Sequence, residues 1–375
     1  MTYVEAVIVG AGPAGLAAAA CLHRVGVPYV ILEREGCVGA SWHHHYERLH
    51  LHSDKAHSAL PYFPLPKHYP RYPSREQFVA YLESYARRFK IHPRFGEEVY
   101  SARLRDGRWH VRTRHAIYES RYLILATGYN ARPYLPAWPG QETFTGEIVH
   151  SAIYKNGAPY REKRVLVIGF GNSGGEIAID LWEHGARATL SVRGPVNVVP
   201  REMLGVPILA IAILLEKVPT QIADALAALV VRLTLGDLAR LGLQTGSEGP
   251  FAQIGRRGRV PLLDVGTVGL IRKGAIEVRP GAERFDGRDV IFADGARQRY
   301  DAVVLATGYR PTVDSLLQGA NRLTDERGNP RRSGHEVAEG LYLCGFHVSP
   351  TGMLREIAME AKRIARDIDR TRAGG

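Results

Sequence analysis

The chain has 375 residues, of which 45% are hydrophobic and 23% are charged, and its formal net charge is +11. This composition is typical of a globular protein long enough for two domains. The positive charge suits anionic ligands or a basic solvated surface, but no block of basic residues with interleaved aromatics indicates nucleic-acid binding.

Cys21, Cys37 and Cys344 lie far apart without a Cys-x-x-Cys motif. We therefore expect no redox dithiol and a reducing, cytoplasmic location, and the absence of a basic leader before the first apolar run argues against a signal peptide.

A first glycine-rich turn follows a strand expected at residues 4–9. It reads Gly10-Ala-Gly-Pro-Ala-Gly15, and it precedes a helix expected at 16–25 and a strand at 29–32 that ends at Glu33. In such a unit the glycines permit the tight turn, the approach of a pyrophosphate and close helix packing, while the acid accepts hydrogen bonds from a ribose. The pattern predicts a dinucleotide site that comprises Gly10, Gly12, Pro13, Ala14, Gly15, Glu33 and Arg34.

Aromatic and histidine residues crowd the next segment. Two interpretations of Trp42 stay open, since it can close over the cofactor or be an ordinary loop aromatic. Adjacent His43, His44 and His45 diverge and no acid or cysteine completes a set, so we expect no metal site. A helix is predicted at 74–89, capped by Ser74 and Gln77, and an antiparallel meander at 99–118.

Two strands end in the same short sequence. Residues 122–129 contain Ala-Thr127-Gly128, and residues 302–309 contain Ala-Thr307-Gly308. Glycine at these ends lets the chain pass close to a ligand or to another backbone. The near-repeat predicts two related crossings between domains, with these threonines and glycines at the cofactors.

A second glycine-rich turn follows a strand expected at 164–168. It comprises Gly169, Gly171, Asn172, Ser173 and Gly174, and a helix to Glu183 and a strand at 188–192, which contains Ser191, come next. The strand ends at Arg193, where the first unit has an acid. A guanidinium suits a 2′-phosphate, whereas a carboxylate suits a 2′-hydroxyl. The first site therefore reads as FAD and the second as NADPH.

An apolar region occupies residues 203–245. Neither of its uncharged stretches reaches the ~20 residues that span a bilayer. Buried helices lining an apolar pocket, an interfacial membrane patch and plain domain core stay open as interpretations. A last strand ends at Gly345, and a closing helix is expected at about 353–370 with its N-terminus toward the flavin.

The segment between the two glycine-rich turns carries a further motif, Phe144-x-Gly146-x-x-x-His150-Ser151-x-x-Tyr154. It resembles the signature of flavin-containing monooxygenases, within the class B flavin-dependent monooxygenases. The nearest resemblance is to the YUCCA-type indole-3-pyruvate monooxygenases and covers nearly the whole chain. Similar stretches include residues 46–52, 72–78, 126–130, 169–174, 200–205, 263–267 and 306–310. The chain departs from the family pattern at residues 53–55 and 345–353.

The resemblance implies an α/β fold with two Rossmann-like dinucleotide-binding domains. An FAD domain, formed by residues 1–154 and 301–375, would be interrupted by an NADPH domain at 155–300 with the apolar helical insert at about 203–245. His150, Ser151 and Tyr154 would set how the domains and the nicotinamide meet the flavin.

The resemblance also implies an activity. NADPH would reduce FAD, dioxygen would form a C4a-(hydro)peroxyflavin, and one oxygen atom would pass to a small organic substrate, either a 2-oxo acid such as indole-3-pyruvate or a soft sulfur or nitrogen nucleophile. His52 stands where related enzymes carry an Asn beside the flavin, and is the expected catalytic residue; its alternative is a packed loop histidine. Other functions left open are an NADPH-dependent flavin reductase that passes electrons to a partner or disulfide, and a redox-sensing nucleotide binder. Membrane contact and oligomeric state also stay open, with a dimer as one alternative.

Overall fold

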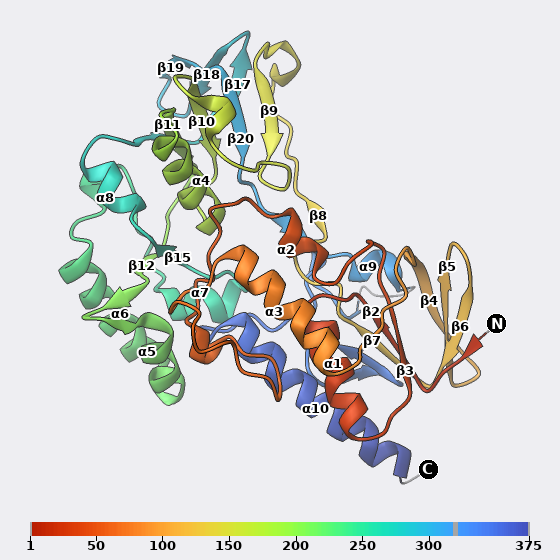
Figure 1. The fold of residues 1–375 in the computed structure, drawn as a ribbon. Helices are drawn as coiled ribbons and strands as arrows, with labels where there is room; N and C mark the ends of the chain where they lie inside the picture. The colour runs from red at the N-terminus through yellow and green to blue at the C-terminus, as the bar shows by residue number, and fades with distance from the viewer. Residues whose placement is uncertain (1, 318–321, 374–375) are drawn as a thin grey trace.

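The computed structural model describes residues 2–317 and 322–373. Figure 1 shows two α/β units side by side, each built around one five-stranded sheet, and we call these units the first and the second layer. The first is a five-stranded sheet in the order β22-β23-β7-β2-β3. Its central strands pair in parallel and are buried along their length, as apolar runs in a doubly covered sheet should be. The strands are β2 (Ala6–Val9), β3 (Tyr29–Leu32), β7 (Tyr122–Leu125), β22 (Glu336–Ala338) and β23 (Leu341–Leu343).

The second sheet has the order β16-β11-β10-β20-β9, and all its pairs are parallel. Its strands are β9 (Glu147–His150), β10 (Arg164–Ile168), β11 (Arg187–Val192), β16 (Glu277–Pro280) and β20 (Ala302–Leu305). The predicted fold class, two dinucleotide-binding units in one α/β chain, is confirmed. The domain boundaries at 154 and 300 stay predictions, and the pairing places β9 and β20, which lie outside 155–300, in this second sheet.

Helices pack beside both sheets. Helix α1 (Pro13–Arg24) packs on α10 (Met353–Ala373) and α3 (Arg75–Arg88), and their apolar faces form the core beside the first sheet. The capping box predicted at Ser74 and Gln77 is confirmed: the Gln77 N–H donates to the Ser74 hydroxyl, and the Gln77 side chain accepts from the Ser74 N–H. Helix α4 (Asn172–Glu183) covers the second sheet with α8 (Thr267–Arg272).

Antiparallel elements complete both layers. The predicted meander is present as β4 (Val99–Arg105), β5 (Arg108–Thr113) and β6 (Ile117–Ser120), with β1 (Thr2–Tyr3) added in parallel to β6. Strands β17 (Ala282–Asp286), β18 (Asp289–Phe292) and β19 (Arg297–Arg299) form a second meander. Where the chain crosses between the layers, β8 (Arg132–Pro133) pairs with β21 (Tyr309–Arg310), so the two Ala-Thr-Gly segments lead into one shared ribbon.

The apolar insert contains α5 (Ile208–Leu214), α6 (Thr220–Thr234) and α7 (Pro250–Arg257), held by the short ribbons of β12 (Val198–Pro200) with β15 (Leu262–Asp264) and β13 (Glu202–Met203) with β14 (Val206–Pro207). In Figure 1 the insert lies below α4 and the second sheet, with α5 and α6 at the left and α7 toward α10. Within the residues that the structure describes, no helix is both long and apolar enough to cross a membrane.

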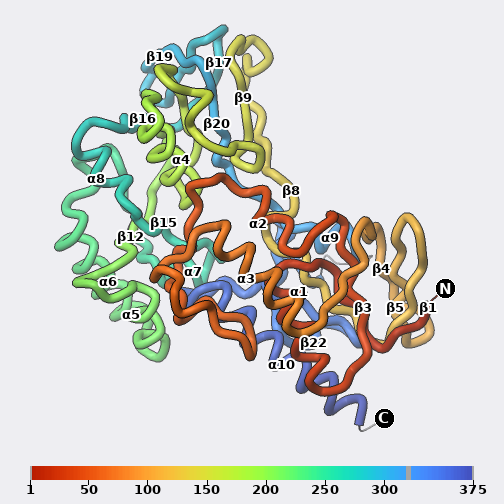
Figure 2. The backbone as a smooth tube through the Cα atoms, in the orientation of Figure 1, coloured from red at the N-terminus to blue at the C-terminus, as the bar shows by residue number. Residues whose placement is uncertain are grey.

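One segment of the first layer reaches the second. After the short helix α2 (Ala40–His44), the chain crosses toward α4, as the red tube in Figure 2 shows. Tyr46 and Leu49 of this crossing are buried in the core of the second sheet. We call residues 44–52 the strap. After the strap, the chain forms one turn of 3-10 helix at Lys55–His57 and returns to the first layer before α3. A short helix, α9 (Val313–Leu316), follows β21 much later in the chain.

Candidate active site

A single cavity of about 1930 Å³ lies at the carboxyl ends of both sheets, where open α/β folds bind their ligands. Most of the site residues predicted from the sequence line it. These are Gly10, Gly12, Pro13, Ala14, Glu33, Arg34, Trp42, His52, Thr127, Gly128, Ser151, Gly169, Gly171, Asn172, Ser173, Ser191, Arg193, Thr307, Gly308 and Gly345. Gly15, His150, Tyr154 and Gly174 stand outside the cavity wall. The role of each residue in binding a cofactor stays a prediction.

The first glycine of each turn is required by the backbone. Gly10 has φ +105° and Gly169 has φ +111°, values that side-chain-bearing residues rarely adopt. A Cβ at Gly10 would lie 2.7 Å from the Ala126 carbonyl oxygen, and one at Gly169 would lie 2.5 Å from that of Ala306. Each turn therefore packs directly against one of the two Ala-Thr-Gly segments, which explains the near-repeat.

The second glycine of each turn faces open space. A Cβ at Gly12 or at Gly171 would have nothing within 4 Å. These residues are the N-caps of α1 and α4, and no side chain caps either helix, so the first N–H groups are free for an anion. The arrangement fits the pyrophosphate of a dinucleotide at each turn. The last glycines, Gly15 and Gly174, instead allow helix–strand packing, because a Cβ there would come within 1.9 and 2.1 Å of a carbonyl oxygen.

The residues that follow β3 and β11 differ in charge. Glu33 is buried, and its carboxylate accepts from the Ala11 N–H at 2.6 Å and the Glu35 N–H at 3.0 Å. Arg193 is exposed at the cavity edge and takes part in none of the ion pairs found among residues 2–317 and 322–373. Burial and the neighbouring arginines, Arg193 among them, lower the pKa of Arg259 on the same wall. This end of the cavity is therefore an uncompensated positive region suited to a phosphate.

Two predicted cofactor residues use their side chains to brace the wall. The Asn172 Oδ1 accepts from the Leu263 N–H at 2.7 Å, which attaches β15 to the start of α4. The Ser191 hydroxyl donates to the Pro280 carbonyl at 3.0 Å, which joins the ends of β11 and β16. Both side chains are thus committed to protein partners, and their neighbouring backbone forms the surface of the cavity.

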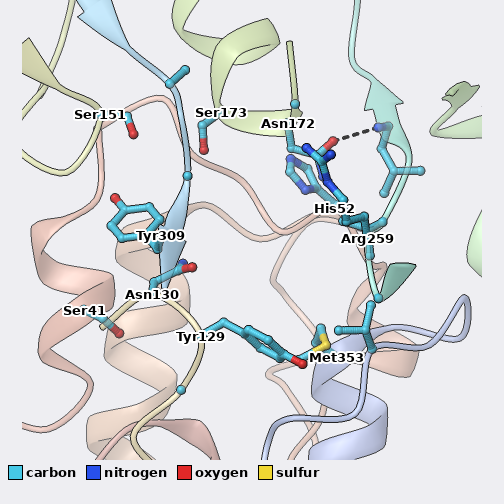
Figure 3. Close-up of a pocket in the computed structure, with 18 of the residues that line it drawn as sticks. Ser41, His52, Tyr129, Asn130, Ser151, Asn172, Ser173, Arg259, Tyr309 and Met353 are labelled. Carbon is cyan, nitrogen blue, oxygen red and sulfur yellow. Dashed lines mark hydrogen bonds between the residues drawn. The ribbon is translucent and has the colours of Figure 1, made fainter. Parts of the chain in front are cut away.

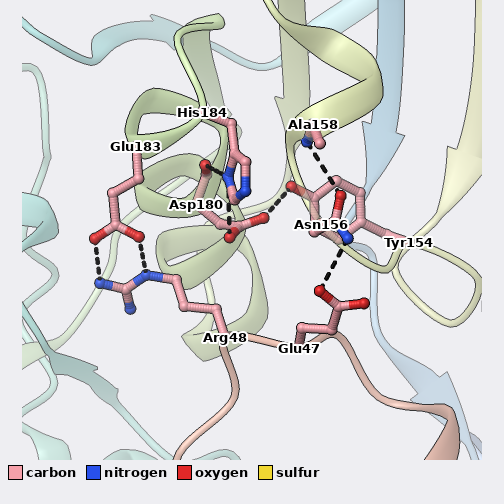
Figure 4. A network of polar contacts seen from close by, with 8 residues as sticks. All are labelled: Glu47, Arg48, Tyr154, Asn156, Ala158, Asp180, Glu183 and His184. Carbon is pink, nitrogen blue, oxygen red and sulfur yellow. Dashed lines mark hydrogen bonds and ion pairs between the residues drawn. The ribbon is translucent and has the colours of Figure 1, made fainter.

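The monooxygenase-like motif connects the layers. The His150 Nε2–H donates to the Gly308 carbonyl at 3.1 Å and its Nδ1 accepts from the Ala152 N–H at 3.1 Å, so both ring nitrogens are committed. Burial lowers the pKa of His150, which favours the neutral ring. The Tyr154 hydroxyl donates to Asp180 of α4 at 2.5 Å (Figure 4). These two side chains hold the chain crossing and α4 in place.

His52, at the end of the strap, lines the cavity together with His44, His45 and His50 of the same segment (Figure 3). Its Nε2 bonds the Oε1 atom of Glu176, a buried residue of α4 that our sequence interpretation did not single out. The available signal was an acid only two residues after the last glycine of the second turn, on a helix that is otherwise buried there. The His52 ring is partly exposed to the cavity and has a buried carboxylate partner, and its catalytic role stays a prediction.

The insert supplies the apolar part of the wall, in agreement with the pocket-lining interpretation. Side chains from α5, α6 and α7 line the cavity. Met353, at the start of α10, lies on the same wall (Figure 3). The α5 helix meets the turn before α10 closely, since a Cβ at Gly352 would lie 3.1 Å from the Leu209 side chain. Several insert side chains also face solvent, among them Leu204, Leu214 and Leu233 at 97%, 79% and 77% exposure. The insert is therefore both cavity wall and apolar surface.

Comparison with known proteins identifies the family. A family model described as pyridine nucleotide-disulphide oxidoreductase matches residues 7–202. The indole-3-pyruvate monooxygenase YUCCA4 of Oryza sativa subsp. japonica is 42% identical over 97% of this chain and 87% of its own. A flavin-containing monooxygenase from Stenotrophomonas maltophilia is 25% identical with a TM-score of 0.74 over the full length of both chains. The bacillithiol disulfide reductase of Bacillus cereus shares the fold, at 21% identity and a TM-score of 0.71 over 99% of this chain and 100% of its own. The chain thus belongs to the pyridine nucleotide-disulphide oxidoreductase family and, within it, to the flavin-dependent monooxygenases of the YUCCA type.

Proposed function

We propose that the protein is an NADPH- and FAD-dependent monooxygenase that transfers one oxygen atom of O2 to an aromatic 2-oxo acid such as indole-3-pyruvate, with release of CO2. The observation that carries this proposal is that two dinucleotide turns open into one cavity whose wall also has an apolar part and a positive part. The 42% identity to an indole-3-pyruvate monooxygenase over nearly the whole chain supports the substrate class.

The chain binds and orients the cofactors. FAD, when bound, supplies the oxygen-activating chemistry with electrons from NADPH. The N-terminus of α1 would hold the FAD pyrophosphate at Gly12, and Glu33 would accept from its ribose. The N-terminus of α4 would hold the NADPH pyrophosphate at Gly171, with Arg193 at the 2′-phosphate.

The substrate would lie against the insert. Its aromatic ring would contact the apolar side chains of α5 and α7, which also keep water from the reacting atoms. Arg259 lies on the same wall as His52 and Met353 (Figure 3), and its guanidinium suits the carboxylate of a 2-oxo acid.

The cysteines give no support to a disulfide reductase. Cys21 and Cys344 are buried, and burial raises the pKa of both thiols. Cys37 is partly exposed, yet burial together with nearby acids raises its pKa too. None of the three lies among the residues of the cavity wall. A reactive dithiol needs a stabilised thiolate, which these environments oppose.

A sequential mixing experiment tests the function. The purified protein is reduced anaerobically with NADPH and then mixed with O2 and indole-3-pyruvate, while the flavin spectrum and the products are followed. We expect indole-3-acetate in near stoichiometry with NADPH consumed. A thioether serves as the competing acceptor, and turnover that yields only hydrogen peroxide with every acceptor would contradict the proposal.

A further inference from the structure

The contact between His52 and Glu176 joins the two halves of the active site. His52 belongs to the strap of the first layer, whereas Glu176 lies on α4 of the second, 124 residues away. The carboxylate side chain is only 4% exposed, whereas the imidazole is 21% exposed on the cavity wall. The acid is therefore placed behind the histidine, and the histidine faces the ligands.

The contact decides which ring nitrogen is free. A carboxylate accepts but does not donate, so the bond to Glu176 requires the hydrogen on Nε2 of the neutral ring. Among the hydrogen bonds of the described residues, no other involves the His52 ring, which leaves Nδ1 without a protein partner. Nδ1 is then the atom that can take up or release a proton on the cavity side.

Glu176 has few other partners. Its Oε2 atom is buried and forms no hydrogen bond with any residue in the described ranges. A buried carboxylate with an unsatisfied oxygen is costly unless a positive partner compensates it. Arg48 and His45 act on this carboxylate electrostatically, whereas the imidazole of His52 bonds it directly and can carry a second proton. The buried hydroxyl of Tyr46 also contacts this carboxylate, and it stays protonated because burial raises its pKa.

The proposed reaction needs a proton at this place. In the overall balance, a 2-oxo acid, O2, NADPH and one proton give the carboxylate shortened by one carbon, CO2, NADP+ and water. One O–O bond breaks and one C–C bond breaks, NADPH is the two-electron reductant, and the proton ends in water. A side chain with an exchangeable proton beside the reacting atoms therefore serves each turnover.

We propose that Glu176 is a positioning residue that fixes the His52 ring with Nε2–H on the carboxylate and Nδ1 toward the cavity, so that His52 delivers the proton consumed in each turnover. This inference rests on the proposed monooxygenase function. It assigns Glu176 no contact with substrate. The pair acts as a unit in which the acid holds the tautomer and the histidine exchanges the proton.

A neighbouring ion pair supplies a matched control. Arg48 of the strap binds Glu183 of α4 through two hydrogen bonds of 2.8 and 2.9 Å (Figure 4). Glu183 lies seven residues after Glu176 on the same helix, so this pair fastens the same strap to the same helix but is not part of the cavity wall. A variant of Arg48 loosens the strap without removing the partner of His52.

The first test reads the tautomer directly. The protein is labelled with 15N-histidine, and the ring nitrogens of His52 are assigned by their loss in His52→Gln. We expect a protonated Nε2 and an unprotonated Nδ1 in the wild type and in Arg48→Met, and a loss of this single tautomer in Glu176→Gln. A protonated Nδ1 in the wild type, or the same tautomer in Glu176→Gln, would overturn the proposal whatever the activity.

The second test reads turnover. Glu176→Gln should lower kcat for 2-oxo acid decarboxylation about 10- to 100-fold, with the KM for NADPH changed less than about threefold. Arg48→Met should keep kcat within about threefold, and imidazole added to His52→Ala should restore part of its activity. Equal losses in Glu176→Gln and Arg48→Met would show that the contact only fastens the strap. If Glu176→Gln does not fold, the kcat of Glu176→Asp and the imidazole rescue of His52→Ala distinguish the proton-exchange role from strap fastening instead. A wild type that forms no oxygenated product would contradict the proposed function instead, and would leave the tautomer result intact.

Discussion

In the two glycine-rich turns, Gly12 and Gly171 are the glycines whose Cβ position faces open space. One added methyl group at each of them tests which cofactor binds at which turn. Gly12→Ala and Gly171→Ala place that methyl at the N-cap of α1 or of α4. Because a Cβ at either position meets nothing within 4 Å and neither glycine has a positive φ, the protein itself should tolerate the change. We expect the free energy of unfolding without nucleotides to change by less than about 1 kcal/mol.

The affinity for the nucleotide at each turn should fall far more than the stability does. A pyrophosphate approaches the backbone where the methyl would stand, and each lost hydrogen bond to a charged group is worth about 1.5–3 kcal/mol. Losing one of them gives about 1.5–3 kcal/mol, which is about a 10- to 150-fold rise in Kd. Gly171→Ala should therefore retain FAD and bind NADPH weakly, whereas Gly12→Ala should be purified largely without flavin.

The assay measures bound flavin by absorbance after purification and the Kd of NADP+ by calorimetry. Gly269→Ala is the control, because Gly269 lies in α8, away from the cavity wall, and a Cβ there also meets nothing within 4 Å. It should alter neither nucleotide. Loss of flavin from Gly171→Ala with normal flavin in Gly12→Ala would reverse the assignment and refute the reasoning.

Three further predictions concern the same cavity. Gly169→Ala combines a φ of +111° with a Cβ only 2.5 Å from the Ala306 oxygen, so urea unfolding should show a loss of about 2 kcal/mol or more; an unchanged midpoint would contradict the close approach. Arg193→Ala should raise the KM for NADPH about 10- to 100-fold and that for NADH by less than about threefold, and equal effects on both would remove the 2′-phosphate role. Burial, aided by the charge of Lys155, lowers the pKa of His45 from 6.5 to about 4. The neutral ring therefore stabilises the fold above pH 6.5, and this contribution, of the order of 3 kcal/mol, is lost as the pH falls from 6.5 to about 4. His45→Gln should show a shallower loss of stability over that pH range in chemical denaturation, and identical pH profiles would contradict it.

The parts of the site that follow from local rules were predictable from the sequence. Gly10 and Gly169 are needed by the conformation of their own turns, and Ser74 and Gln77 cap a helix through groups three residues apart. Such requirements act within a few residues, so they leave a readable pattern. Family membership and the fold class were accordingly predicted and are confirmed.

The contacts between distant segments were not predictable in this way. Glu176 meets a histidine 124 residues away, and no spacing within α4 indicates that partner. The same holds for Tyr154, which stands outside the cavity wall because its hydroxyl is committed to Asp180. The insert lines the cavity and also faces solvent, because an apolar stretch has the same composition in both situations.

The strap has a consequence for how this chain can be divided. Tyr46 and Leu49 belong to the core of the second sheet although they lie early in the chain, and Arg48 and Glu47 of the same segment bind Glu183 and Asn156 (Figure 4). A fragment limited to residues 155–300 would lose these side chains and leave a cavity in its core. The nucleotide-binding units therefore resemble separate modules in their sheets, yet they are not interchangeable parts. A chimera that takes its second unit from a relative must also take the strap, or rebuild the surface that receives it.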